Sequence, residues 1–129
     1  MAAHTAADGA VLRADVVGRD DGPTLVVLAG GAAAHPAYLG DLAGLGERYR
    51  LVVPHLRGVG RSAHAAPASR WEQADDVDRL RASLGLDRCT VVAHSAGTRL
   101  AVAHAARFPE RVAALVLVRR SRHSGRSRT

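Results

Sequence analysis

The chain has 129 residues, of which 47% are hydrophobic and only 3% are aromatic. This is enough for one domain with a core built mainly from Ala, Val and Leu. Every basic residue is Arg, and five of them lie in residues 119–129, where no acidic residue occurs. The formal net charge of +6 therefore belongs mostly to that segment, and it does not indicate a nucleic-acid-binding fold.

The sequence also lacks the patterns of secretion and membrane insertion. No charged N-terminal segment precedes an apolar one, and no apolar run approaches about 18 residues. The one cysteine, Cys89, begins an apolar run, so we expect a buried thiol and no intramolecular disulfide. These features predict a cytoplasmic protein with no membrane partner.

Five segments are predicted to be strands. Apolar and polar residues alternate over Val11–Val17, ahead of a turn rich in Asp and Gly, so we expect an edge strand there. Four later runs are apolar throughout: Thr24–Leu28, Leu51–Pro54, Cys89–Ala93 and Val112–Val118. Because these runs do not alternate, each is expected to be buried on both faces, as in a parallel sheet. Their spacing suits repeated strand–helix units.

Helical patterns occupy the segments between these runs. Apolar residues recur at helical spacing over residues 38–49. Residues 69–72 (Ser-Arg-Trp-Glu) form a capping box and Gly85 is a stop signal, so a second helix is expected between them. A third helix, rich in Ala, follows Ser95 and ends before Pro109.

Together these elements predict an α/β fold, with a mostly parallel sheet flanked by helices. We expect the folded part to cover residues 1–118. Residues 119–129 hold no core-forming pattern, so we expect them to form a disordered Arg-rich tail.

The most informative motif is Ala-His-Ser-Ala-Gly at residues 93–97, between an apolar run and the Ala-rich helix. Small residues on both sides permit a sharp strand-to-helix bend that exposes the Ser95 hydroxyl above the helix N-terminus. This pattern predicts Ser95 as a nucleophile and the backbone N–H of Ala96 as a donor to an oxyanion. A serine in a purely structural turn is the alternative, and the strand before and the helix after favour the nucleophile.

Three further segments carry a family resemblance. They read Leu-Ala-Gly-Gly-Ala at residues 28–32, Pro-His-Leu-Arg-Gly-Val-Gly-Arg-Ser at residues 54–62, and Arg-Phe-Pro-Glu-Arg-Val at residues 107–112. In this order, and with the serine motif, residues 10–118 resemble the N-terminal half of an α/β-hydrolase. They look most like the esterase, lipase and proline-iminopeptidase branch of that family.

The resemblance implies a serine hydrolase that acts on a small-molecule ester or amide and needs no cofactor. Ser95 would attack the carbonyl carbon, and the backbone N–H groups of Gly31 and Ala96 would form the oxyanion hole. Three positions depart from the family pattern: Ala29 stands for the usual His, His55 for Asp and Ala93 for Gly. We expect Ala29 to loosen the oxyanion loop and His55 to have a modest effect on a mainly architectural loop. We expect Ala93 to be tolerated next to the nucleophile.

A larger departure concerns the rest of the triad, whose order in this fold is Ser, acid, His. After Ser95 the sequence has Glu110 as its only carboxylate side chain, and His104 and His123 as its only histidines. His104 falls within a predicted helix, Glu110 in a surface turn and His123 in the predicted tail. We therefore expect a truncated hydrolase domain that lacks its catalytic acid and histidine and is inactive alone.

Other functions remain open. A non-catalytic remnant or interaction module could self-associate through an exposed edge strand at residues 112–118. Residues 58–63 match a dinucleotide-binding fingerprint, but Pro67 follows where a helix should run, so this alternative is weaker. No metal site is expected, since the sequence has no cysteine cluster and no helical His pair beside a carboxylate. Without interleaved aromatic residues, the tail does not predict a nucleic-acid partner.

Overall fold

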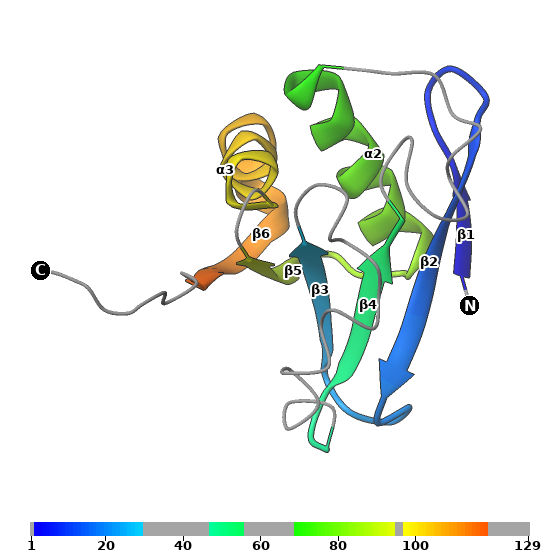
Figure 1. The fold of residues 1–129 in the computed structure, drawn as a ribbon, viewed down its shortest axis with the longest axis vertical. Coiled ribbons are helices and arrows are strands. Elements are labelled where there is room, and N and C mark those ends of the chain that lie inside the picture. Colours follow the sequence, from blue (N-terminus) through cyan, green and yellow to red (C-terminus); the bar gives the residue numbers. More distant parts are fainter. Residues whose placement is uncertain (1, 30–46, 56–68, 95–96, 119–129) are drawn as a thin grey trace, which may run out of the picture.

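The computed structural model describes residues 2–29, 47–55, 69–94 and 97–118. Within these ranges six strands form one sheet, in the order β1-β2-β4-β3-β5-β6 (Figure 1). The strands are β1 (Ala2–Thr5), β2 (Val11–Gly18), β3 (Thr24–Ala29), β4 (Arg50–Pro54), β5 (Cys89–His94) and β6 (Val112–Val118). Strands β3 to β6 are mutually parallel, whereas β1 and β2 join the sheet antiparallel. The predicted α/β fold with a mostly parallel sheet is confirmed.

Two helices accompany the sheet, α2 (Arg70–Ser83) and α3 (Gly97–Arg107), followed by the short 3₁₀ turn η3 (Pro109–Arg111). The predicted capping box begins α2: the Ser69 hydroxyl accepts from the Glu72 backbone N–H at 3.1 Å, and the Glu72 carboxylate accepts from the Ser69 N–H at 3.0 Å. Gly85 follows the helix with a φ of 74°, a conformation that glycine adopts without strain. The start and the stop predicted for this helix are therefore both confirmed.

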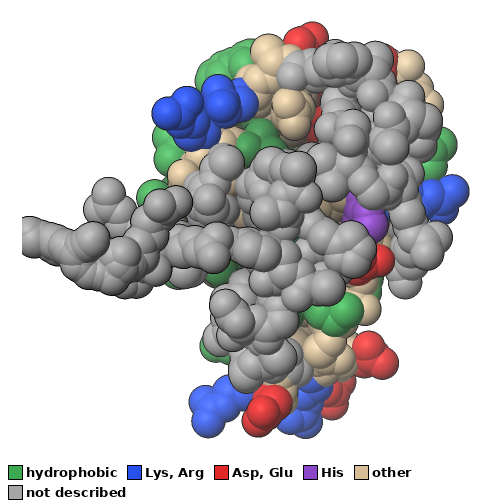
Figure 2. All heavy atoms as spheres, in the orientation of Figure 1, with side chains coloured by type: hydrophobic (Ala, Val, Ile, Leu, Met, Phe, Trp, Pro, Cys, Tyr) green, Lys and Arg blue, Asp and Glu red, His purple; other side chains and the backbone are tan. Residues whose placement is uncertain are grey.

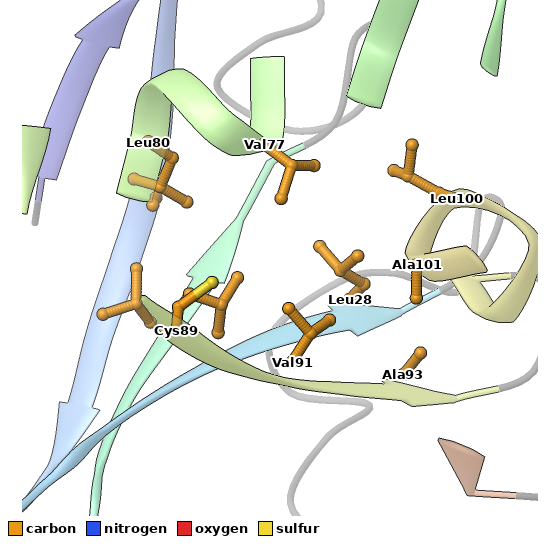
Figure 3. Close-up of a cluster of buried hydrophobic side chains, with 11 residues drawn as sticks. Leu28, Val77, Leu80, Cys89, Val91, Ala93, Leu100 and Ala101 are labelled. Atoms are coloured by element: carbon orange, nitrogen blue, oxygen red, sulfur yellow. The ribbon is translucent and has the colours of Figure 1, made fainter. Parts of the chain in front are cut away.

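Both helices pack on the same face of the sheet. The buried cluster between them comprises residues of four strands and both helices: Ala14, Val26, Leu28, Val52, Val77, Leu80, Cys89, Val91, Ala93, Leu100 and Ala101. In Figure 3, Val77 and Leu80 of α2 point down toward the strands, and Ala101 of α3 faces Ala93. On the opposite face, Val27 and Val53 are also buried, at 0% and 3% exposed. The central strands are thus buried on both faces, as their unbroken apolar sequence predicts.

The antiparallel side of the sheet corrects one prediction. Val11–Val17 was expected at an edge, but β2 lies between β1 and β4. The missed strand is β1, whose sequence Ala-Ala-His-Thr is too short and too poor in β-branched residues to be predicted. Gly9, with a φ of 85°, lies in the turn that brings β1 back onto β2.

The other edge of the sheet is apolar. Among the described residues β6 pairs only with β5, and Val116 and Leu117 are 45% and 50% exposed. The burial on both faces that was predicted for residues 112–118 is therefore wrong, because β6 lies at an edge of the described sheet. Of the helix predicted over residues 38–49, residues 47–49 form a turn and bend instead, and the rest lies outside the described residues. The predicted tail at residues 119–129 lies outside them too.

Candidate active site

The strand-to-helix junction predicted around the serine is bounded by β5, which ends at His94, and by α3, which begins at Gly97. Ser95 and Ala96 themselves lie outside the described residues. The structure confirms a buried strand immediately before them and a helix immediately after them, which is the context that the chemistry requires. Both roles stay predictions.

The register of the central strands brings two predicted parts of the site to one edge. β3 and β5 are neighbours, and Ala29, the last residue of β3, lies opposite His94, the last residue of β5. The chain therefore leaves the sheet at adjacent points on its way to Gly31 and to Ser95. Gly31 lies outside the described residues, so its role also stays a prediction.

Ala93 shows how the chain accommodates the methyl group at a position where the family usually has Gly. Its side chain is fully buried, and it points toward Ala101 of α3 (Figure 3). Leu100 and Ala101 occupy the face of α3 that packs on the sheet, and the small Ala101 leaves room for a second methyl group. Position 93 thus tolerates Ala because its neighbour on the helix is small.

His55 belongs to a group on the antiparallel side of the sheet. Its Nε2 lies 2.8 Å from Asp15 Oδ2, and its backbone N–H donates to the Arg13 carbonyl at 2.8 Å. Asp15 is on β2, which is on the opposite side of β4 from β3 and β5. This His–Asp pair resembles part of a triad in chemistry, but two strand spacings, about 10 Å, separate β4 from β5. The pair therefore belongs to the antiparallel side of the sheet and not to β3 or β5.

His55 is one member of a group that we call the strand cluster, defined as His4, Asp15, His55 and Asp76. Three of its members, His4, His55 and Asp76, line a small cavity together with Leu12, Pro54, Val77 and Leu80. His4 is 7% exposed, and burial lowers its pKa against the opposing charge of Asp76. Its Nδ1 has no hydrogen-bond partner among the described residues.

A second group, which we call the helix cluster, consists of Asp78, Arg81 and His104. Asp78 accepts hydrogen bonds from Arg81 Nε at 2.8 Å and Nη2 at 3.0 Å, and His104 Nε2 lies 3.3 Å from its Oδ1. Burial alone would raise the pKa of the Asp78 carboxyl, but the hydrogen bonds from Arg81 and His104 outweigh it and lower that pKa. Burial lowers the pKa of His104, so this histidine is neutral near pH 7.

The helix cluster excludes His104 as the general base of this site, as its sequence position predicted. The side chain is fully buried and directed at Asp78 on the neighbouring helix. Glu110 is exposed in η3, beyond the end of α3, and the 11 residues of α3 span about 15 Å. His104 is therefore engaged with Asp78, and Glu110 lies beyond the end of α3 that is distant from Gly97.

A sequence profile describing the alpha/beta hydrolase fold matches residues 23–124. The chain belongs to the α/β-hydrolase fold family. The match includes the strands β3 to β6, both helices and the serine motif. The resemblance seen in the sequence is confirmed.

Individual α/β-hydrolases show how much of such a protein the chain covers. RutD of Caulobacter sp. (strain K31), whose name assigns it provisionally to carbamate hydrolysis, is 34% identical over 100 residues, or 76% of this chain and 37% of that protein. The proline iminopeptidase of Neisseria gonorrhoeae is 35% identical over 105 residues, or 78% of this chain and 33% of that protein. The crystal structure of Cfl2 from Burkholderia cenocepacia matches with a TM-score of 0.75 and 30% identity, covering 89% of this chain and 40% of Cfl2. The chain therefore spans two fifths or less of the length of these proteins.

Sequence reasoning missed Asp15 and Asp78 as partners of buried histidines. Their partners lie 40 and 26 residues away in the sequence, so only the fold brings them together. The described residues contain no group of three or more His, Cys, Asp or Glu side chains that could hold a metal ion. No helix in the described ranges is both long and apolar enough to cross a membrane.

Proposed function

We propose that this chain carries the nucleophile and the oxyanion hole of a serine hydrolase that cleaves a small ester or amide. The observation that carries the proposal is the register of Ala29 opposite His94, with α3 beginning at Gly97. It supports a serine at the carboxyl end of β5 beside a glycine-rich segment at the carboxyl end of β3. In open α/β sheets this edge is where ligands bind.

In the proposed reaction the Ser95 hydroxyl oxygen attacks the carbonyl carbon of the substrate, and a base accepts the hydroxyl proton. The backbone N–H groups of Gly31 and Ala96 stabilise the negative oxygen of the tetrahedral intermediate. Its collapse breaks the bond to the leaving alcohol or amine, which takes up the proton. Water then hydrolyses the acyl group from Ser95 and restores the enzyme.

We propose that the base and its acid come from sequence outside these 129 residues. Two observations support this: His104 is buried against Asp78, and His55 is paired with Asp15 on the distant side of β4. The relatives contain long regions that the chain does not match. These relatives are named a provisional carbamate hydrolase and a proline iminopeptidase, and carbamates and peptides both contain a carbonyl carbon bonded to a heteroatom. That shared chemistry supports the proposed substrate class.

The test is labelling of Ser95 by a fluorophosphonate, measured by mass spectrometry of the intact protein and its peptides. We expect slow modification of Ser95 that the S95A variant abolishes, because no base activates the hydroxyl. Modification that spares Ser95 and falls on other serines would contradict the nucleophile. A rate equal to that of full-length RutD would contradict the external base.

The second candidate function is an interaction module, and the exposed apolar strand β6 favours it. We propose that an uncharged edge of this kind, with no further strand paired to it among the described residues, self-associates. Sedimentation velocity should then show oligomers of the chain, and the L117K variant should shift them toward monomer. A monodisperse monomer over a wide concentration range would exclude this candidate.

The buried free thiol of Cys89 is consistent with the cytoplasm, which we propose as the compartment.

A further inference from the structure

The helix cluster joins the two helices through one carboxylate. Two of the three donors to Asp78 come from Arg81, one turn further along α2, so they stabilise that helix locally. The third donor, His104, comes from α3 and is fully buried. The Asp78–His104 contact is therefore a polar link between α2 and α3, in which the His104 side chain is fully buried and the Asp78 side chain is 15% exposed.

Only the neutral form of His104 can make this link without leaving a buried N–H group that has no acceptor. With its proton on Nε2, the neutral ring donates to Asp78, and Nδ1 is left as an acceptor. Nδ1 has no hydrogen-bond partner among the described residues. Protonation would add a buried N–H at Nδ1 with no acceptor there, which is costly in an apolar interior. Burial accordingly lowers the pKa of His104.

In the part of the chain that the structure describes, few charged groups surround His104. From α2 it meets Asp78 and Arg81, and the thiol of Cys89 on β5 is buried near Arg81. Strands β3 and β6 carry no ionisable side chain at all. The remaining charged residues close to α3 are Arg99 and Arg107 on the helix itself and Glu110 and Arg111 on η3, where Arg111 pairs with the exposed Asp87. Burial is thus the main influence on the pKa of His104 and lowers it, Asp78 opposes that effect, and Arg81 adds to it.

This link lies on the same face of α3 as the contacts to the sheet. Leu100, Ala101 and His104 are the buried residues after Gly97, and their spacing places them on one side of the helix. Ala101 packs near the junction against Ala93, and His104 lies about 10 Å along the axis from Gly97. Together with the exposed contact of Arg107 on Trp71, these two contacts along the helix fix its rotation and its position.

We propose that Asp78 is a positioning residue: through His104 it holds α3, and with it the adjoining Ser95, in register with the carboxyl ends of β3 and β5. The proposal rests on the proposed function of Ser95. Asp78 touches neither substrate nor nucleophile in this proposal. Its effect on reactivity passes through the orientation of α3.

The test compares Asp78→Asn with Asp75→Asn, a matched control on the same helix that removes an exposed i,i+4 ion pair with Arg79. Two readouts are measured on the full chain: hydrogen exchange of the α3 amides and the rate of Ser95 labelling by a fluorophosphonate. We expect Asp78→Asn to speed exchange over residues 97–107 at least ten-fold and to slow labelling several-fold. Asp75→Asn should change neither readout. Equal behaviour of the two variants would overturn the proposal.

A pH series separates positioning from a general loss of structure. In the wild type, the protection of the α3 amides (the intrinsic exchange rate at each pH divided by the observed rate) should fall, and labelling should fall with it, as acid protonates His104. His104→Gln keeps an N–H donor near the Nε2 position but does not titrate in this range, so it should retain most of the labelling rate at pH 7.5 and lose the acid step. An unchanged acid step in His104→Gln would refute the role of His104.

The outcome for Ser95 is independent of the outcome for the helix. If the wild type is not labelled at Ser95, the proposed function fails, and the exchange data still report whether Asp78 holds α3. If Ser95 is labelled but neither Asp78→Asn nor acid affects labelling or exchange, the positioning role fails and the nucleophile stands.

Discussion

The helix cluster and the strand cluster contain the same kinds of side chain on opposite sides of α2, yet they are built differently. In the helix cluster one carboxylate, Asp78, collects donors from two helices and is closed off by packing. In the strand cluster the histidines and carboxylates come from β1, β2, α2 and the end of β4, and three of them line a small cavity. The first cluster fixes two helices to each other, whereas the second joins the antiparallel strands to the body of the sheet.

The comparison teaches that a His–Asp contact does not by itself indicate catalysis. Both His55–Asp15 and His104–Asp78 have the pairing of a catalytic dyad, yet the first lies on the antiparallel side of the sheet and the second links α2 to α3. What distinguishes them from a catalytic pair is direction and access, which depend on the sheet order and on burial. The following predictions test how far the two clusters differ.

The largest effect is expected from Asp78→Ala. It leaves Arg81 and His104 without their shared carboxylate in a buried setting, and breaking such an arrangement costs about 3 kcal/mol of unfolding free energy. Urea denaturation measures the loss. Asp75→Ala, which removes a surface pair with Arg79, should cost about 0.5 kcal/mol or less. A similar loss of unfolding free energy in both variants would show that the helix cluster contributes no more to stability than a surface ion pair.

Acid should weaken both clusters. Burial lowers the pKa of His4 and of His104 below the ordinary value of 6.5, so the unfolded chain takes up protons first as the pH falls. The stability that this provides is complete above about pH 6.5 and declines below it, by at most about 1.4 kcal/mol per pH unit for each histidine. Thermal unfolding from pH 7.5 to 5 gives the slope for the wild type, His4→Gln and His104→Gln. Each variant should flatten the slope, and no change in either would contradict the buried, neutral state.

A smaller effect is expected in the strand cluster from Asp15→Asn. The change removes the charge opposite His55 at a site where Asp15 is still 24% exposed. We expect a loss of about 1 kcal/mol, because water replaces part of the hydrogen bonding. The same urea titration measures it. A loss as large as that of Asp78→Ala would show that the two clusters are equally closed.

The smallest effect is expected at the outer end of the helix pair. Arg107 lies over the Trp71 ring at 5.6 Å and donates to the Trp71 carbonyl at 2.8 Å, and Trp71 is 54% exposed. Arg107→Ala should cost about 0.5 kcal/mol, as exposed cation–π contacts do. Trp71 fluorescence reports the change directly. If Arg107→Ala lowered the free energy of unfolding by more than Asp15→Asn does, the exposed Arg107–Trp71 contact would be the main link between α2 and α3.

The parts of the fold that were predictable are those that local sequence determines. The unbroken apolar runs predicted β3 to β6, and the capping box at residues 69–72 predicted where α2 begins. The strand β1 was not predictable, because four residues of low β-propensity gain their structure only by pairing with β2. The helix and strand clusters depend on contacts across 26 and 40 residues, which no local pattern encodes.

In the candidate site, too, the local framework was predictable from the sequence and the long-range contacts were not. A strand before Ser95, a helix after it and a glycine segment following β3 were all predicted, and the described residues bear out the strands and the helix. The roles of Ser95, Gly31 and Ala96 stay predictions. The arrangement of charged side chains was harder to predict than the strands and helices.

Away from the candidate site, Figure 2 shows basic and acidic side chains intermixed near the turn after β2, where Arg19 and Asp21 form an ion pair.

The position of β1 has a practical consequence for labelling. Three strands separate β1 from β5, so a dye attached ahead of Ala2 would lie about 20 Å from the junction that follows His94. That separation lies within the working range of short-distance energy transfer. It is also large enough to keep a small dye clear of the carboxyl ends of β3 and β5. The amino terminus is therefore a suitable place from which to watch α3 move.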